Sequence, residues 1–324
     1  MTLKFIVLNL CATKCSFTLK NSVPFYYLLA VFSMLFLGLT FVWFTIAVKY
    51  YEPITIIFIR LVISSVLLFA AAYMLRQNEK IKKEDYKWFL LLALTQPFFY
   101  FLGESFGLKF VSPTISSAII ATIPLFASLA AVWFTREKAS VLTWSGILVS
   151  FSGILIMLVN RDMSLNASPK GVLLLFMAVF SAVIYSVIVK KLTNKYSALT
   201  IISHQNLLGA FYFLPLFLIF DFKHFINVPV NSELILSIAQ LAFFGSCLAY
   251  LFFIMAVAKL GMVKANIFTN LIPVFTAVFA YFVISETFTV QKIVGVLLVV
   301  SGILVSQSSD IRQIILKKRT GLKI

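Results

Sequence analysis

The sequence has few of the residues that soluble enzymes and metalloproteins use for their chemistry. Its 324 residues include three cysteines and two histidines. Cys11 and Cys15 have no second ligand pair beside them, which argues against a zinc site, and three cysteines do not suggest a disulfide framework. The chain also lacks a phosphate-binding loop and a recognisable nucleophile–base pair. We therefore expect no metal, no cofactor and no nucleotide-driven pump.

Charge is also scarce, since charged residues make up 12% of the chain and apolar residues 61%. The mean hydropathy is +1.03. A soluble protein of this composition has too few polar side chains to cover its surface. We therefore predict an all-α polytopic membrane protein, surrounded by the lipid bilayer.

Ten stretches are apolar over roughly the 20 residues that a membrane-spanning helix needs. We number them spans 1 to 10: Tyr26–Val48, Ile54–Leu75, Trp88–Leu108, Val111–Thr135, Val141–Val159, Gly171–Val189, Ser197–Phe220, Leu234–Ala258, Ala265–Ser285 and Ile293–Ser308. Most connections are short, which makes successive helices antiparallel neighbours. The longer breaks, such as Asp221–Glu233, carry the turn and charged residues of surface loops. Residues 1–25 precede the spans, and a basic tail, residues 309–324, follows them.

The positions of the basic residues predict the orientation. The net charge is +16, but Lys and Arg lie between the apolar runs and form no basic stripe, so we expect no binding to nucleic acid. The termini and the loops on their side hold 20 Lys and Arg, and the opposite loops hold 6. Because basic loops stay in the cytoplasm, we predict cytoplasmic termini for a protein of the bacterial cytoplasmic (inner) membrane.

Part of the sequence occurs twice. A shift of 149 residues aligns Ile123-Pro124 with Ile272-Pro273, Gly146 with Gly295, and Gly153 with Gly302. We predict two five-span repeats, residues 26–160 and 161–308. Because five is an odd number, the second repeat enters the membrane from the opposite side. Two inverted five-helix repeats with a substrate near the midplane are typical of alternating-access transporters.

With this duplication the chain resembles the EamA-type transporters of the drug/metabolite transporter superfamily. The resemblance rests on Pro53 and Arg60 at span 2, on Pro124 to Glu137 and Pro273 to Glu286 across spans 4 and 9, and on the paired glycines. It covers the chain from about Tyr26 to Ser308. It implies a secondary transporter of small organic metabolites, which most often exports amino acids or related compounds.

Two other classes stay open as alternatives. A membrane enzyme that acts on lipid or polyprenyl substrates needs clustered Asp, Glu or His at one interface, and the loops contain no such cluster. A channel is the third class, but inverted repeats with prolines near the midplane favour a carrier. The sequence does not decide between a monomer and a homodimer.

Arg60 and Glu104 are charged residues inside the apolar spans. Arg60 lies roughly 10 Å from the outer end of span 2, and Glu104 roughly 6 Å from the outer end of span 3, at 1.5 Å per residue. A charge at this depth costs about 2.5–3.5 kcal/mol or more, so each should face the interior of the bundle and find a partner. The two residues are expected to form an ion pair that fixes the helices, or to belong to a substrate or proton site.

Other polar residues share a helix face with each other. Gln96, Tyr100 and Glu104 recur every four residues along span 3, and Asn266 and Asn270 do so in span 9. Polar contacts between helices can explain Gln96 alone. We interpret the whole set as the lining of a substrate cavity.

The remaining candidate residues can have a purely structural role as well as a functional one. Pro124 and Pro273 each remove one helical hydrogen bond, which predicts a bend point or a static kink. His204 and Gln205 lie in the inner half of span 7 and are candidates for substrate binding, although a neutral, hydrogen-bonded histidine is the simpler interpretation. Four glycines predict close packing of helices: Gly146, Gly153, Gly295 and Gly302.

Overall fold

A computed structural model describes residues 23–77, 79–127, 141–159, 167–229, 231–287 and 289–319, and the regular secondary structure in these ranges is helical. Seven helices are long and apolar enough to cross a membrane: Pro24–Ala47, Pro53–Met74, Lys83–Leu108, Pro169–Leu192, Ala198–Asn227, Ser232–Leu260 and Lys264–Ile284. Three shorter apolar helices complete the set: Pro113–Ala127, Trp144–Leu158 and Val290–Ser306. The prediction of ten helices is therefore confirmed for the described part of the chain. Glu137 and the end of span 4 lie outside it.

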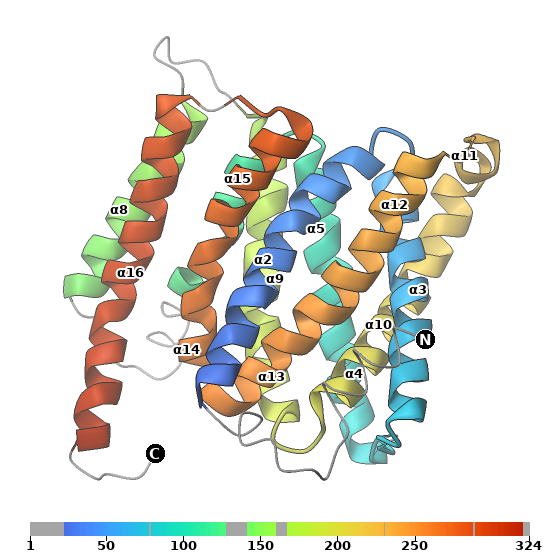
Figure 1. Ribbon diagram of the computed structural model, residues 1–324, viewed down its shortest axis with the longest axis horizontal. Coiled ribbons are helices and arrows are strands. Elements are labelled where there is room, and N and C mark those ends of the chain that lie inside the picture. Colours follow the sequence, from blue (N-terminus) through green and yellow to red (C-terminus); the bar gives the residue numbers. More distant parts are fainter. Residues whose placement is uncertain are drawn as a thin grey trace.

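Several of these helices are divided into shorter elements (Figure 1). Those of the first half are α2 (Val23–Ala47), α3 (Pro53–Met74), η2 (Lys83–Asp85), α4 (Tyr86–Ala93), η3 (Leu94–Phe99), α5 (Tyr100–Leu108), α6 (Pro113–Ile120) and α8 (Val141–Leu158). Those of the second half are α9 (Pro169–Leu192), α10 (Ala198–Leu216), η4 (Phe217–Asp221), α11 (Phe222–Asn227), α12 (Ser232–Gln240), η5 (Leu241–Ala249), α13 (Tyr250–Leu260), α14 (Met262–Ile267), η6 (Phe268–Leu271), α15 (Ile272–Ile284) and α16 (Val290–Arg319).

Prolines begin three of the helices. Pro53, Pro113 and Pro169 stand in the first turn of α3, α6 and α9, and the residue before each has an extended backbone. Proline is suited to this position because the first helical N–H groups have no acceptor within the helix. These prolines therefore set where the chain re-enters the bundle after a short connection.

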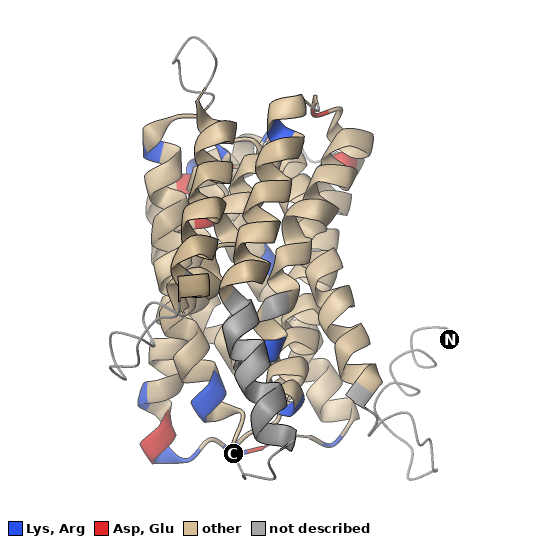
Figure 2. Cartoon of the chain, turned by 90° about the vertical axis from the view of Figure 1, so that its left-hand side faces the viewer, with Lys and Arg blue, Asp and Glu red and all other residues tan. Residues whose placement is uncertain are grey.

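The helices form one bundle whose outer surface is apolar. α2 packs against α15, α13 and η5, and α3 packs against α10. Large apolar side chains such as Val66, Leu148, Val187 and Phe282 remain exposed on the outside. Charged residues lie mainly at the two ends of the bundle (Figure 2). A bundle with an apolar surface between charged ends is the architecture of an integral membrane protein with several spans.

α8 and α16 form a pair at one side of the bundle (Figure 1). A Cβ atom added to Gly146 would lie 2.4 Å from the carbonyl oxygen of Gly302, and one added to Gly153 would lie 2.7 Å from that of Gly295. The residue early in one helix therefore meets the residue late in the other, so the two helices run antiparallel. The four glycines let the two backbones approach to a distance that no side chain permits.

The predicted loop Asp221–Glu233 is wrong in its first half. The helical segment continues through η4 and α11 to Asn227 before the chain turns. Aromatic packing accounts for this extension, because the Phe225 ring lies 5.5 Å from the Phe217 ring and 5.3 Å from the Tyr51 ring. Charged residues alone indicated a loop, whereas the aromatic residues between them hold the extra turns against the bundle.

Candidate functional site

A small cavity lies in the middle of the bundle, where both halves of the chain meet. Its volume is about 50 Å³. From spans 1, 3 and 4 it is lined by Met34, Leu37, Gln96, Tyr100, Ile120 and Ile123, and from spans 6, 8 and 9 by Ala182, Tyr185, Ser186, Tyr250, Phe253, Asn266, Thr269 and Ile272. The first, third and fourth spans of each half therefore contribute, in matching pairs.

The backbone is irregular beside this cavity in four of the spans. α6 ends at Ile120 and helix resumes at Ile123, while the matching span passes through the tight helix η6 before α15 begins at Ile272. Both interruptions immediately precede Pro124 and Pro273. The third span of each half is irregular as well: the helix breaks at Gln96 within η3, and η5 is a widened helical stretch. Widened turns of this kind are frequent at functional sites, because they expose backbone groups to a neighbour or ligand.

Gln96 joins the two halves across the cavity. Its backbone leaves the helical region, with φ −143° and ψ 119°, and its side-chain Nε2 donates a hydrogen bond of 2.6 Å to the Tyr250 hydroxyl. The Ser181 hydroxyl donates to the carbonyl oxygen of Thr95 at 2.6 Å, which satisfies a backbone acceptor next to the break. The irregular segment of span 3 is thus held by polar groups from spans 6 and 8.

Tyr100 and Glu104 form one polar unit on span 3. The Tyr100 hydroxyl donates a hydrogen bond of 2.8 Å to Oε1 of Glu104, and both side chains are buried. Tyr100 faces the cavity, whereas Glu104 lies behind it. Of the helix face predicted from the four-residue spacing, Gln96 and Tyr100 line the cavity, whereas Glu104 is buried between the helices.

The predicted direct ion pair between Arg60 and Glu104 is wrong for this structure. Within the described ranges, the ion pairs shorter than 4.0 Å are Lys109–Glu52, Lys195–Asp85 and Lys292–Glu286. The Arg60 guanidinium instead lies flat on Phe101, with Cζ 3.7 Å from the ring centroid. Arg60 and Glu104 are both buried on helices that touch, α3 and α5, but depth along two helices did not fix the rotation that brings their atoms together.

The two asparagines of span 9 differ in their surroundings. Asn266 lines the cavity. Asn270 is 3% exposed, and neither its Oδ1 nor its Nδ2 has a hydrogen-bond partner in the structure. A buried amide without partners is costly, so Asn270 is a notable group at the interrupted stretch of span 9.

The polar run of span 7 does not reach the cavity directly. His204 Nδ1 lies 2.9 Å from the Thr200 carbonyl oxygen, and its ring packs on Phe69 and Phe89. Gln205 accepts a hydrogen bond of 3.3 Å from the Tyr185 hydroxyl and therefore lies behind a cavity residue. The run thus places Gln205, but not His204, next to the site.

Tyr185 and Tyr250 were missed by the sequence reasoning, together with the apolar contribution of spans 1 and 6. Each is a tyrosine inside an otherwise apolar span, and each donates or accepts a hydrogen bond at the cavity. Tyr100 is predicted because it shares a helix face with Gln96 and Glu104, whereas the four-residue pattern of polar residues includes neither Tyr185 nor Tyr250. A phenol buried in hydrocarbon needs a polar partner, which is the signal that could have identified them.

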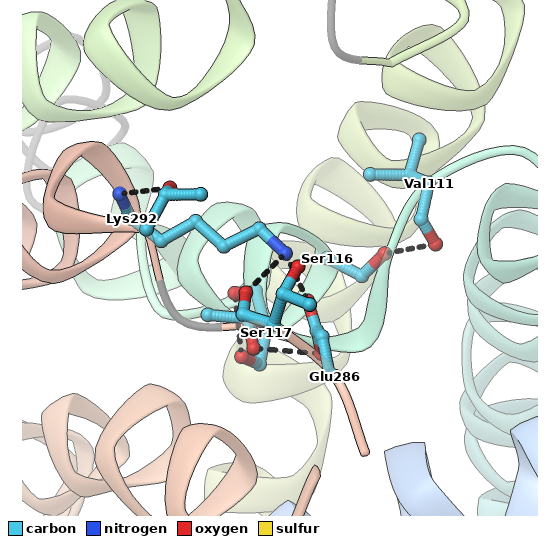
Figure 3. A network of polar contacts seen from close by, with 8 residues as sticks. Val111, Ser116, Ser117, Glu286 and Lys292 are labelled. Atoms are coloured by element: carbon cyan, nitrogen blue, oxygen red, sulfur yellow. Dashed lines mark hydrogen bonds and ion pairs between the residues drawn. The ribbon is translucent and has the colours of Figure 1, made fainter. Parts of the chain in front are cut away.

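Polar contacts between the halves also close both ends of the bundle. At one end, Glu286 accepts from Lys292 Nζ at 2.8 Å and from the Thr114 hydroxyl at 2.9 Å, with Ser116 and Ser117 nearby (Figure 3). At the other end, Asp85 accepts from Lys195 Nζ at 2.7 Å and from the Tyr196 hydroxyl at 2.8 Å.

The Asp85 end contains a cluster in which a buried carboxylate meets a half-exposed lysine. The hydrogen bond from Lys195 to Asp85 raises the pKa of the Lys195 ammonium above its usual range. Burial raises the pKa of the neighbouring Tyr196 phenol. These contacts favour the charged lysine and the protonated tyrosine, and they connect the loop before span 3 with the loop before span 7.

Comparison with solved structures supports the fold. A protein of known crystal structure superposes with a TM-score of 0.67, over 90% of this chain and 99% of that chain, at 17% sequence identity. At this identity the likeness concerns the fold alone.

Sequence relatives carry the name of uncharacterized transporters. An uncharacterized transporter of Archaeoglobus fulgidus is 24% identical over 86% of this chain and 95% of its own length. The uncharacterized transporter YetK of Bacillus subtilis is 25% identical over 76% of each chain. The model of the EamA-like transporter family matches twice, at residues 24–159 and 169–307. The two matches correspond to two duplicated halves, and the chain is a membrane transporter of the EamA-like transporter family.

Proposed function

We propose that this chain is a secondary transporter that exports small organic metabolites, amino acids or related compounds among them, by alternating access. The central cavity is the substrate site, and Gln96, Tyr100 and Asn266 are its polar lining. The observation that carries the proposal is the matched contribution of both halves to this cavity, at paired interruptions of the helix backbone. Substrates of such transporters are held at the interface of the repeats by broken helices.

The two halves are inverted repeats in this proposal. The antiparallel contact of α8 with α16 supports it, because these helices hold equivalent places in the two halves. Pro124 and Pro273 are then equivalent bend points on opposite sides of the cavity. All ten helices cross the bilayer, and both termini are cytoplasmic, as the distribution of Lys and Arg indicates.

In the present conformation the cavity is too small for an ordinary ligand. A volume of about 50 Å³ is well below the roughly 300–1,000 Å³ of ordinary ligand pockets. Polar contacts between the halves are present at both ends of the bundle. Substrate entry therefore requires one end to open and the cavity to widen, which distinguishes a carrier from a permanently open channel.

Counterflow in proteoliposomes tests the proposal. Liposomes that contain the purified protein are loaded with a mixture of the twenty amino acids, and uptake of trace labelled amino acids is measured. A carrier gives transient, saturable uptake that depends on the internal load. The double variant Gln96→Leu, Tyr250→Phe should weaken it, whereas Leu148→Val, a change at a lipid-facing position of 71% exposure, should not.

Two outcomes contradict the proposal in different ways. Uptake that does not saturate and does not need internal substrate indicates a channel. No uptake of any amino acid removes this substrate class. Comparing metabolites in the medium of overexpressing and deletion cells then identifies the compounds to be loaded next.

A further inference from the structure

We propose that Arg60 binds the carboxylate of the transported substrate, while Glu104 binds its ammonium group, so that the substrate is a small zwitterion of the α-amino acid type. This inference rests on the proposed transport function and assigns the substrate class to named side chains. It starts from two opposite charges that are buried together and are not paired with each other.

Arg60 has the features of a binding residue that awaits an anion. It is 2% exposed, and its Nε has no hydrogen-bond partner. No ion pair shorter than 4.0 Å joins it to another described residue, and the contact that orients it is the face of the Phe101 ring. Arginine stays charged in proteins, so burial does not neutralise it. A fully buried guanidinium without an anion is costly, and a bound carboxylate removes that cost.

The stacking on Phe101 also determines what Arg60 can bind. With one face of the guanidinium against a ring at 3.7 Å, the hydrogen-bond donors on its edge remain in the plane of the group. A carboxylate meets that edge with two parallel hydrogen bonds. Lysine, as a single point charge, does not reproduce this geometry. A planar, two-oxygen anion is therefore the ligand that fits.

Glu104 provides the complementary charge. It is 7% exposed, accepts one hydrogen bond from the Tyr100 hydroxyl, and has no cation of another described residue within 4.0 Å. An ionised carboxylate has room for further donors, and an ammonium group supplies three. Glu104 is hydrogen-bonded to Tyr100, and the Phe101 ring under Arg60 lies 6.3 Å from the Tyr250 ring. Both charges are thus one residue removed from the cavity residues Tyr100 and Tyr250. When the halves separate and these tyrosines move, a zwitterion can reach both charges.

The second half of the chain shows that the fold does not require a charge at this place. An offset of 145 residues aligns Arg60 with Gln205. Gln205 is buried, and its neutral side chain accepts a hydrogen bond from the cavity residue Tyr185. Glutamine is thus tolerated at the equivalent position of the same fold, which makes Arg60→Gln the matched substitution.

The experiment measures how three related compounds are recognised by the unchanged protein and by the variants Arg60→Gln and Glu104→Gln. The amino acid that gives the greatest counterflow with the unchanged protein is selected first. It is compared with its amide, which lacks the carboxylate, and with the corresponding carboxylic acid that lacks the amino group, as competitors of labelled uptake. Arg60→Gln should reduce the preference for the amino acid over its amide about ten- to hundredfold. Glu104→Gln should reduce the preference over the carboxylic acid to a similar extent.

Thermal unfolding in detergent without substrate separates binding from structure. Arg60→Gln removes a buried charge that has no ion pair shorter than 4.0 Å among the described residues, and it loses only the contact with Phe101. The variant should therefore melt at the same temperature as the unchanged protein or higher. Lys195→Gln is the control, since it breaks the contact with Asp85 far from the cavity and should leave all probe preferences unchanged. The inference is wrong if Arg60→Gln lowers the melting temperature by several degrees, or if it transports with unaltered preference. If the unchanged protein transports no amino acid, the proposed substrate class fails, whatever the variants do.

Discussion

The close contact of α8 and α16 gives a sharp prediction for Gly302→Val. A Cβ atom at Gly302 would lie 2.5 Å from the backbone nitrogen of Ser150 and 2.6 Å from the carbonyl oxygen of Gly146. Normal contacts are about 3.5–4.0 Å, so the helices must separate by about 1 Å. Forced separation in a packed interface costs about 1–3 kcal/mol, and the obstacles here are backbone atoms that cannot rotate away.

The free energy of unfolding in detergent micelles, measured by titration with a denaturing detergent, is the appropriate assay. Leu304→Val is the matched control, because it introduces the same residue in the same helix at a position that is 46% exposed. Gly302→Val should lose about 1–3 kcal/mol, and the control should change far less. Gly146→Val should give a similar loss, and the double variant should lose less than the sum, because the helices separate only once. Equal stability of Gly302→Val and Leu304→Val would refute the close approach.

Four further predictions concern orientation and polar contacts. A C-terminal reporter that is active only outside the cytoplasm should stay silent, and its activity would overturn the assigned orientation. In a double-mutant cycle of Gln96→Leu and Tyr250→Phe, unfolding should show a coupling of about 0.6–1.7 kcal/mol; strictly additive losses would speak against their hydrogen bond. Asn270→Leu should weaken apparent affinity in counterflow without lowering the amount of folded protein, and unchanged affinity would place Asn270 outside the site. The folded-state pKa of Lys195 is raised, so its contact with Asp85 is fully present below the ordinary lysine value of 10.5 and is lost as pH rises through the higher folded-state value. The melting temperature should therefore fall more steeply with alkaline pH for the unchanged protein than for Lys195→Gln.

The ten helices and the close glycine contacts followed from the sequence because both depend on local, repeated features. A span must be apolar over the bilayer thickness. A glycine that occurs at equivalent places in both repeats indicates a helix whose backbone packs closely against another helix. Gly146 and Gly302 lie at the contact between α8 and α16, as their spacing indicates. The interruptions before Pro124 and Pro273 also depend on local sequence, because a proline inside a helix removes a backbone hydrogen bond.

Side-chain partners could not be obtained in the same way. The depth of Arg60 and Glu104 follows from residue number, but their pairing depends on how each helix is rotated about its axis. Tertiary packing sets that rotation, and it places Phe101 rather than Glu104 against the guanidinium. The extension of span 7 to Asn227 was missed for a similar reason, since it depends on contacts of Phe225 with rings that are distant in sequence.

One carboxylate from each half caps a helix of the other half. Asp221, at the end of span 7, accepts hydrogen bonds of 3.0 Å from both the backbone nitrogen and the hydroxyl of Thr55, in the first turn of α3. Glu79, after span 2, accepts one of 2.9 Å from the backbone nitrogen of Ser197, which caps α10. The free N–H groups and the positive end of the helix dipole favour a carboxylate at both places.

These two caps lie at opposite ends of the bundle, because α3 and α10 pack together with the end of each span near the start of the other. In the proposed alternating-access cycle, opening one end would separate one carboxylate from its helix, while the cap at the other end would stay in place. Each open conformation would then lose one carboxylate cap, which would keep the free energies of the two similar. Near-equal free energies of the two open states are what a carrier needs to cycle between them.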